Sequence, residues 1–306
     1  MTGPRRRVFP LVPRRRFAGV PFGDRRSPRR GSGDEIAGSR PYHPGDHIAT
    51  IDWKASARLS AARGGDEFLV REFFAQESLR VALVCDRRPA LALYEPPLPW
   101  LDKAAALETA AGLISASAAA GRAELAYVDF AGGRAPWLRP ARRPEDEVQA
   151  RFRETAYDAP PDGLERALRH LGSRAGELPF GTFVFVVSDF LAPVPREVWR
   201  RARELEWDVV AVVVQDPTWE QSFPDVGGVV LPLADPETGR LAPTRLTARA
   251  ARARREANEA RLARLLARFR LLGFDHVVLS SSDPEAVLAA FRAWARRRRS
   301  FLRRRA

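Results

Sequence analysis

Short apolar runs that end in an aspartate constrain the fold of this chain more than any other feature. Four of them span residues 80–86, 125–129, 182–189 and 209–216. A short run that is apolar at consecutive positions is typical of a strand buried on both faces of a parallel sheet. The four closing residues, Asp86, Asp129, Asp189 and Asp216, then lie at the ends of the predicted strands.

Segments with helical composition alternate with these strands. Helices are expected at 100–120, 162–171, 195–205, 247–272 and 284–296, a last strand at 276–279, and a short strand pair within 223–243. Strand alternating with helix predicts an α/β fold, an open and mostly parallel sheet with helices on both faces. Ligands bind such sheets outside the carboxyl ends of the strands, so the aspartates mark the candidate site.

Composition limits the class of protein. The chain has 306 residues, 45% of them hydrophobic, which is enough to bury a full core. Its formal charge of +13 is carried almost wholly by arginine, since Lys54 and Lys103 are the only lysines. A basic balance raises the affinity for nucleic acid, anionic lipid or acidic protein surfaces. The excess arginine is concentrated at the two ends of the chain.

Targeting signals are not evident. The N-terminal residues are basic and lack a continuous apolar stretch, so they do not resemble a signal peptide. No segment reaches the roughly 18 apolar residues that a transmembrane helix needs. We therefore expect a cytoplasmic protein without a transmembrane segment, with peripheral membrane contact through arginine left open. The single cysteine, Cys85, lies within a predicted strand, where a small buried residue is expected.

Enzymatic activity is not expected. Four histidines are present, His43, His47, His170 and His276, and none neighbours a nucleophile motif. His43 and His47 are four residues apart, but Pro44 and Gly45 separate them, so they do not share a helical face as zinc ligands would. No phosphate-binding loop or dinucleotide fingerprint occurs.

A second feature lies ahead of the predicted sheet, within residues 29–78. Pro44, Gly45 and Asp46 form a turn signal, because proline presets φ and glycine accepts positive φ. The candidate interaction residues in this segment are Arg40, Tyr42, Pro44, Gly45, Asp46, Asp52, Trp53 and Arg58. Two interpretations stay open: a contact surface for another protein, or an irregular layer with an architectural role.

The same segment resembles domain-of-unknown-function family 58. The matching positions are Gly31-Ser32-Gly33, Glu35, Arg40, Tyr42, Pro44-Gly45-Asp46, Ile51-Asp52-Trp53, Ala57-Arg58, Val70-Arg71-Glu72-Phe73 and Glu77. Phe74 departs from the pattern, because the family usually has an acid there. The resemblance implies a von Willebrand factor A-like domain over 79–296. A basic flexible arm (1–28), the motif segment packed on that domain (29–78) and a basic tail (297–306) complete the expected organisation.

Domains of the von Willebrand factor A type bind Mg²⁺ through hydroxyl and carboxylate oxygens, the ligands this ion prefers. Asp86 and Asp189 match two of those positions, but Arg88 and Ala90 replace the serines, and the loop 159–162 offers proline instead of threonine. We expect a degenerate, metal-free site, because an arginine beside Asp86 would repel a divalent cation; pairing of Arg88 with Asp86 and Asp189 in place of the ion is an open alternative. An alternative is that these acids cap helices. Mg²⁺ is the only cofactor that the sequence leaves open.

Two hypotheses for the function of the protein stay open. The resemblance implies an adaptor that works with a MoxR-type AAA+ ATPase in chaperone-like maturation or remodelling of client proteins. The alternative is association with nucleic acid or anionic membrane through the arginine-rich ends. The arginines of the second hypothesis are Arg5–Arg7, Arg14–Arg16, Arg296–Arg299 and Arg303–Arg305.

Overall fold

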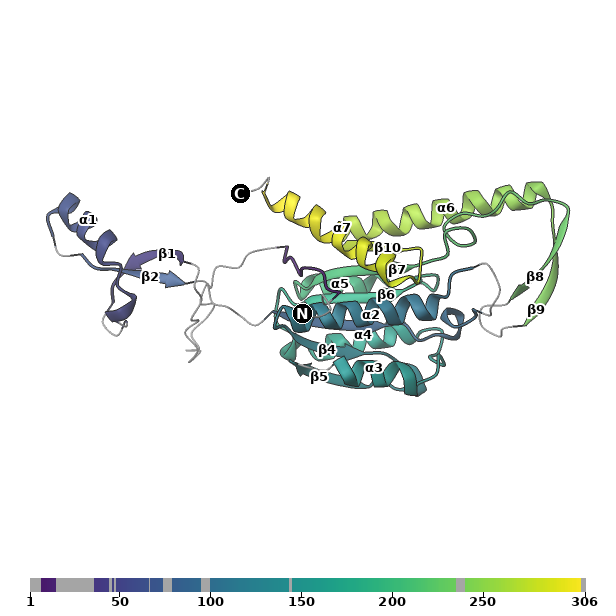
Figure 1. Ribbon diagram of the computed structural model, residues 1–306, viewed down its shortest axis with the longest axis horizontal. Coiled ribbons are helices and arrows are strands. Elements are labelled where there is room, and N and C mark those ends of the chain that lie inside the picture. Colours follow the sequence, from purple (N-terminus) through teal and green to yellow (C-terminus); the bar gives the residue numbers. More distant parts are fainter. Residues whose placement is uncertain are drawn as a thin grey trace, which may run out of the picture. The chain divides into compact units, whose positions relative to one another are not determined.

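The computed structural model describes residues 7–14, 36–43, 46, 48–65, 67–73, 79–94, 100–142, 145–234 and 240–303. The chain divides into two compact units (Figure 1). Unit 1 comprises Met1–Arg14 and Leu79–Ala306, and unit 2 comprises Arg15–Ser78. Each unit is described by itself.

Unit 1 is built on a six-stranded sheet with the strand order β10-β7-β6-β3-β4-β5. The strands are β3 (Arg80–Cys85), β4 (Glu124–Val128), β5 (Trp137–Ala141), β6 (Phe183–Ser188), β7 (Asp208–Val214) and β10 (Asp275–Leu279). All neighbouring pairs are parallel except β4 and β5, which are antiparallel. The predicted open, mostly parallel sheet is confirmed.

The central strands are apolar on both sides because each side faces a separate core. Along β3, Val81 and Leu83 enter one core, whereas Ala82 and Val84 enter the other. Every residue of β6 and β7 is buried. Burial on both faces explains why these strands lack the alternation of a half-exposed strand.

Helices cover both faces of the sheet (Figure 1). The first core contains side chains of α2 (Lys103–Ala120), α3 (Glu145–Glu154) and α7 (Pro284–Arg303). The second core contains side chains of α4 (Gly163–Ser173), α5 (Arg196–Glu204) and α6 (Ala248–Leu271). Among the described residues, no helix combines the length and the apolar character that crossing a membrane requires.

Some elements differ from the expectation. Strand β5 and helix α3 were not expected from the sequence. Strand β5 is half-exposed and contains Pro140, a residue found mainly at sheet edges, so it lacks the continuous apolar pattern of the other strands. The strand pair expected within 223–243 is present as β8 (Val229–Ala234) and β9 (Leu241–Leu246). The expected basic tail, 297–306, is helical through Arg303, since Arg298 is buried and ion-paired.

The expected flexible arm, 1–28, contains a packed segment at residues 7–14. Phe9 is buried and stacks on Phe291 of α7 with ring centroids 4.5 Å apart. Val12 is also buried, and its carbonyl accepts a hydrogen bond of 2.7 Å from Arg298. The expectation of flexibility was wrong for residues 7–14, because the side chains of Phe9 and Val12 are buried in the core of unit 1. Residues 1–6 and 15–28 lie outside the described part.

Unit 2 holds the motif segment. Strands β1 (Ile36–Pro41) and β2 (Leu69–Phe73) form an antiparallel pair. Between them lie a short 3-10 helix, η1 (Ile48–Thr50), and helix α1 (Trp53–Arg63). Strand β2 closes unit 2 by pairing with β1. The Val70 side chain is buried, and the backbone of Val70 forms an antiparallel β-bridge with Ile51.

Candidate functional site

Two aspartates meet at the carboxyl ends of neighbouring parallel strands. Asp86 follows β3 and Asp189 follows β6, and these strands pair in register. The backbone N–H of Asp86 donates to the Val187 carbonyl at 2.9 Å, which extends the ladder to the strand ends. Both carboxylates are buried. Their negative charges therefore need compensation from nearby positive groups.

Arg88 supplies that compensation. Its Nη2 donates to Asp86 Oδ2 at 2.6 Å and to Asp189 Oδ1 at 2.7 Å, while Nε donates to both oxygens of Asp86. The Arg88 residue is only 7% exposed. Its planar guanidinium suits such a position, because it presents several donors in a fixed fork. Arg88 thus lies between the two carboxylates.

Lys103 completes the cluster from the first turn of α2. Its Nζ lies 3.0 Å from Asp189 Oδ2 and 2.7 Å from Glu220 Oε1. Asp102 caps the helix by accepting a hydrogen bond from the Ala105 N–H at 2.9 Å, which fixes where Lys103 emerges. We call Asp86, Arg88, Lys103, Asp189 and Glu220 the charge network.

The charged forms of Asp189, Lys103 and Arg88 are favoured by their neighbours. Burial alone would raise the pKa of Asp189, but the charges of Lys103 and Arg88 hold this pKa below its ordinary value. Burial would likewise lower the pKa of Lys103, and Asp189 and Glu220 together raise it. The pKa of Arg88 is raised by Asp86 and Asp189 in spite of burial. Each charge therefore stabilises its neighbours in the charged form.

Polar neighbours fix the geometry of the network. Ser188 Oγ donates to Asp86 Oδ2 at 2.6 Å, and the Leu191 N–H donates to Asp189 Oδ1 at 3.0 Å. The second oxygen of Glu220 accepts from the backbone N–H of Asp216 at 2.9 Å. Asp216 in turn accepts hydrogen bonds from the N–H groups of Thr218 and Trp219, so it orders the loop that carries Glu220.

These residues do not fit a magnesium ion. Mg²⁺ needs oxygen ligands in near-octahedral geometry. Carboxylate oxygens of Asp86 and Asp189 accept hydrogen bonds from Arg88, and the Ala90 side chain, in a 3-10 turn (Pro89–Leu91), has no ligand atom. No group of three or more metal-ligating side chains occurs within the described ranges. That no cation binds stays a prediction.

Asp129, after β4, belongs to a separate arrangement. Its carboxylate accepts two hydrogen bonds from Arg151, at 2.8 and 3.0 Å, and one from the Tyr127 hydroxyl at 2.9 Å. Nearby, the buried Arg87 guanidinium lies between the rings of Phe152 and Tyr157, 4.6 and 4.2 Å from their centroids. Asp129 therefore has a structural role at the strand end.

In unit 2, the charged motif residues contribute to the local structure. Arg40 makes a bidentate pair with Asp46 at 2.7 and 2.6 Å, and Asp46 also accepts from the His43 N–H. Asp52 caps α1 by accepting from the Ala55 N–H at 3.0 Å, and it pairs with Arg71 at 3.1 Å. The architectural interpretation thus has direct support for Arg40, Asp46 and Asp52.

Other motif residues are available for contact. Trp53 is 59% exposed and meets Phe68 edge to face at 5.9 Å, and Ile48 is 68% exposed. Arg58 is exposed on α1, and the backbone N–H of Tyr42 donates to the Phe68 carbonyl at 2.8 Å. Pro44 and Gly45 lie outside the described residues. Trp53 and Phe68 are thus an exposed pair of aromatic rings on unit 2, and Ile48 is a further exposed apolar side chain of this unit.

The arginines at the ends of unit 1 are partly structural. Arg298 is buried, and its Nε donates to Asp275 at 2.7 Å while Nη1 donates to Asp208 at 2.8 Å. The Arg14 N–H donates to Asp208 at 3.1 Å, and Arg7 pairs with Glu285 at 2.9 Å. These contacts reduce the number of arginines that are available to neutralise phosphate groups. Binding to nucleic acid or anionic membrane stays a prediction that rests on exposed arginines such as Arg296 and Arg299.

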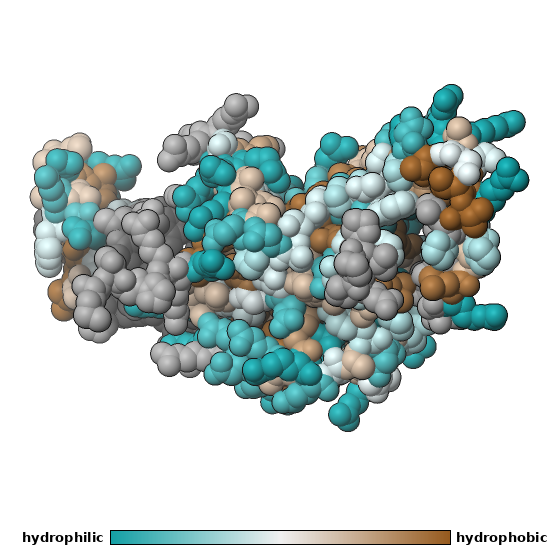
Figure 2. Space-filling model, turned by 45° about the vertical axis from the view of Figure 1, so that its right-hand side comes forward, coloured by the Kyte–Doolittle hydropathy of each residue, from teal (hydrophilic) through white to brown (hydrophobic). Residues whose placement is uncertain are grey.

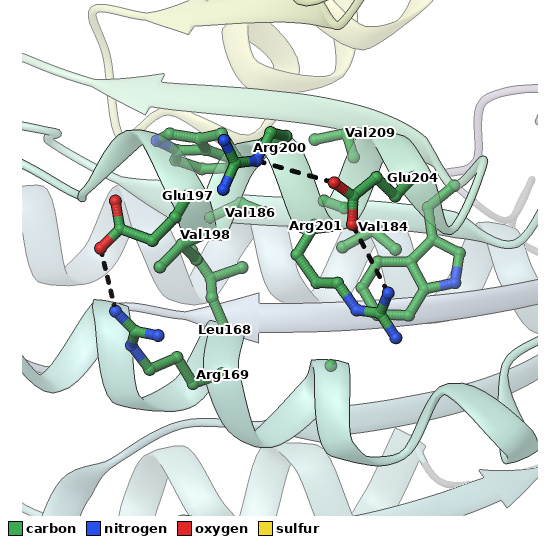
Figure 3. Close-up of a pocket in the computed structure, with 14 residues that line it drawn as sticks. Leu168, Arg169, Val184, Val186, Glu197, Val198, Arg200, Arg201, Glu204 and Val209 are labelled. Carbon is green, nitrogen blue, oxygen red and sulfur yellow. Dashed lines mark hydrogen bonds and ion pairs between the residues drawn. The ribbon is translucent and has the colours of Figure 1, made fainter.

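A small cavity of about 380 Å³ lies between α4 and α5 (Figure 3). Its floor is formed by core side chains, among them Val184 and Val186 of β6. Ion pairs lie at its rim: Arg169 pairs with Glu197 at 3.2 Å, and both Arg200 and Arg201 approach Glu204. The apolar floor and paired rim indicate a gap between packed helices, with no convergent polar groups for catalysis.

Apolar side chains are exposed in two further places on unit 1. The β8–β9 hairpin exposes Val230 and Leu241, and Figure 2 shows hydrophobic residues gathered at the end of unit 1 that carries it. Beside the charge network, Leu93 and Trp100 are 37% and 36% exposed. Leu93 follows the turn after Arg88, and Trp100 precedes Leu101, whose N–H donates to Asp216. We call the charge network with Leu93 and Trp100 the strand-end rim.

Sequence reasoning missed Lys103 and Glu220. Lys103 could have been noticed, because it is one of two lysines and follows the capping residue Asp102 at a helix start. Glu220 carries no local signal, since its partner is 117 residues away in the sequence.

Comparison with known sequences identifies a matching protein family and similar mycobacterial proteins. The sequence profile of the family described as "Protein of unknown function DUF58" matches residues 38–264. The chain is 30% identical over 245 residues to the uncharacterized proteins Rv1480 of Mycobacterium tuberculosis (strain ATCC 25618 / H37Rv) and Mb1516 of Mycobacterium bovis (strain ATCC BAA-935 / AF2122/97). Each alignment covers 76% of this chain and 70% of the relative.

Two solved structures are distant matches. The conserved hypothetical protein BatB from Bacteroides thetaiotaomicron is 12% identical, with a TM-score of 0.41, over 72% of this chain and 100% of its own. An aerotolerance-related membrane protein from Bacteroides fragilis NCTC 9343 is 14% identical, with a TM-score of 0.39, over 71% of this chain and 100% of its own.

Proposed function

The chain belongs to the DUF58 family, and on that premise we propose that it is a non-catalytic protein-interaction module. In this proposal it serves as an adaptor for a MoxR-type AAA+ ATPase in chaperone-like maturation or remodelling of client proteins. The ATPase supplies the energy, and this chain supplies a surface that contacts the ATPase or its client. The ATPase partnership comes from the family resemblance of the motif segment.

The observation that carries the proposal is the position of Arg88 between Asp86 and Asp189. In this arrangement every charged member of the network is paired with another member. Asp189, held in such pairs, is poorly suited to act as a general base, because its pKa is lowered and both its carboxylate oxygens accept hydrogen bonds. A preorganised set of charges suits recognition, since electrostatic complementarity contributes specificity at interfaces.

Exposed apolar side chains close in sequence to the network support a contact role. Trp100 lies three residues before Lys103 and Leu93 five residues after Arg88, both are exposed, and tryptophan is enriched among residues that dominate binding energy. Interfaces combine such apolar anchors with a polar surround. The strand-end rim therefore has the composition of a protein contact surface.

Unit 2 offers a second candidate surface. Its exposed Trp53 is the first residue of α1, whose start is fixed by Asp52, and the ring of Trp53 contacts the exposed Phe68. In this proposal the charged motif residues shape unit 2, while Trp53 and Arg58 make the contact. This division reconciles the architectural and interaction interpretations of the motif.

A binding assay tests the proposal. The full-length chain is immobilised through a tag and exposed to the MoxR-type ATPase of the same organism, with ATP and separately with ADP. Trp100→Ala and Trp53→Ala should each be compared with the matched control Leu241→Ala, an exposed residue of the hairpin. At least one tryptophan variant should weaken retention about tenfold, equivalent to roughly 1.4 kcal/mol.

Two outcomes contradict the proposal. One is that the unaltered chain fails to retain the ATPase with either nucleotide. The other is that both tryptophan variants retain it as well as Leu241→Ala does.

A further inference from the structure

Strand β10 forms one edge of the main sheet. Within the described part of the chain it pairs only with β7. The Leu279 carbonyl accepts a hydrogen bond from the Gln215 N–H at 3.2 Å, so the polar groups of Leu279 face the sheet. Because successive residues of a strand alternate, the backbone N–H and C=O groups of His276 and Val278 face the outer edge. An edge of this kind is a template for another strand.

A groove of about 740 Å³ runs along this edge. Helices α6 and α7 both contact β10, and Figure 1 shows β10 beside them. Arg270 of α6 lines one side, and Ala290, Ala293 and Arg297 of α7 line the other. The small side chains of the two alanines leave room next to the strand. The groove thus combines an open strand edge with space for a chain beside it.

The groove is electropositive. Arg270 and Arg297 are exposed, and neither forms an ion pair with a carboxylate in the described residues. By contrast, Arg14 and Arg298, which also line the groove, both pair with Asp275. Burial and the charges of Arg270 and Arg297 lower the pKa of His276, so its ring is neutral at physiological pH. Two positive charges therefore remain for a ligand.

We propose that the groove binds an extended acidic peptide segment of another protein, which adds to the outer edge of β10 as a further strand. Backbone hydrogen bonds to His276 and Val278 would supply affinity, and carboxylates facing Arg270 and Arg297 would supply specificity. The proposal goes beyond the adaptor function, because the groove does not include the strand-end rim.

Charge argues against an occupant from the same chain. Residues 15–35, which follow Arg14, contain six arginines and three acids. A segment of net positive charge would be repelled by Arg270 and Arg297. A partner segment rich in Glu or Asp has the complementary charge.

The test uses the full-length protein and fluorescence anisotropy. The probe is a capped, fluorescein-labelled peptide of alternating Glu and Val, about eight residues long, which matches a typical strand. A peptide of alternating Lys and Val tests whether binding depends on the negative charge of the probe. A third peptide keeps the Glu-Val sequence but carries N-methyl groups on its central amides, which removes the donors needed for strand pairing.

Matched variants distinguish peptide binding in the groove from nonspecific binding to exposed arginines elsewhere on the protein. Arg270→Glu/Arg297→Glu reverses the two groove charges, and Arg264→Glu/Arg299→Glu makes the same change at exposed arginines of α6 and α7 outside the groove lining. All four positions are exposed, so each variant should fold, and thermal unfolding checks this.

We expect the Glu-Val peptide to bind, and the groove variant to bind it at least about tenfold more weakly than the control variant. The Lys-Val and N-methylated peptides should bind at least about tenfold more weakly than the probe. Equal affinity of the two variants would overturn the proposal, as would undiminished binding of the N-methylated peptide or no binding of the probe. Because the ATPase assay uses other variants, failure of either proposal can be recognised separately.

Discussion

Arg88 is the residue on which the candidate site depends. It joins two buried carboxylates, those of Asp86 and Asp189. Replacing one partner of a buried ion pair is costly, because the other charge stays buried without compensation. The same residue type at the surface would have little effect.

Arg88→Ala should therefore lower the free energy of unfolding by about 3–5 kcal/mol. Arg299→Ala, at an exposed position of α7, should change it by less than about 0.5 kcal/mol. Urea denaturation of the two variants measures both values. A similar small effect of Arg88→Ala would show that the network does not stabilise the fold.

Asp189 gives the network a pH dependence. Its pKa lies below the ordinary value of 3.8, so the folded state favours the ionised form relative to the unfolded state. The stability from this group is present above the ordinary pKa and is lost as the pH falls through the lower, folded-state value.

Between about pH 5 and pH 3, the free energy of unfolding of the unaltered chain should fall more steeply than that of Asp189→Asn, which lacks the titrating group. Asp225→Asn, at an exposed position, should follow the unaltered chain. Denaturation at several pH values provides the measurement. Parallel curves for the unaltered chain and Asp189→Asn would contradict the assignment.

At the scale of elements, the buried strands were predictable and the pairing of distant charges was not. Strand β6 was predicted because all its residues are apolar or small and buried on both faces. Strand β5 was missed because Trp137 and Leu138 are only partly buried and Pro140 interrupts the pattern. The aspartates at strand ends were located from sequence, whereas Glu220 entered the site only through a tertiary contact with Lys103.

Helix α1 provides a prediction at this scale. Asp52 caps it and pairs with Arg71, and the hydrogen bond from Arg71 lowers the pKa of Asp52. Asp52→Ala removes the cap, so amide hydrogen exchange in the first turn of α1 should become faster. Asp52→Asn keeps a capping oxygen and should exchange more slowly than Asp52→Ala. Equal exchange in the two variants would show that the cap does not hold the helix.

At the scale of the whole molecule, the chain divides into a unit that carries the sheet and a unit that carries the motif. The sequence separates the two because the motif residues precede the first buried strand. It does not reveal that residues 7–14 belong to unit 1, since a short basic segment with two buried apolar residues resembles a flexible arm. Phe9 packs against Phe291 and Trp294 of α7, at the far end of the chain.

Phe9→Ala should lower the free energy of unfolding of unit 1 by about 3–5 kcal/mol, the usual cost of removing a buried aromatic ring. Pro10→Ala, at the exposed neighbouring position, is the matched control. Thermal unfolding gives the loss of stability, and amide hydrogen exchange should become faster in β6 and α7 of Phe9→Ala. If Phe9→Ala and Pro10→Ala unfold alike, residues 7–14 do not belong to the folded unit.

We propose that Arg88 supplies the positive charge between Asp86 and Asp189 that a divalent cation would otherwise supply. Thermal unfolding of the unaltered chain with and without millimolar Mg²⁺ or Mn²⁺ provides the test. We predict no change in Tm, because the ligand oxygens are engaged by Arg88. A clear rise in Tm that disappears in Asp189→Ala would contradict it.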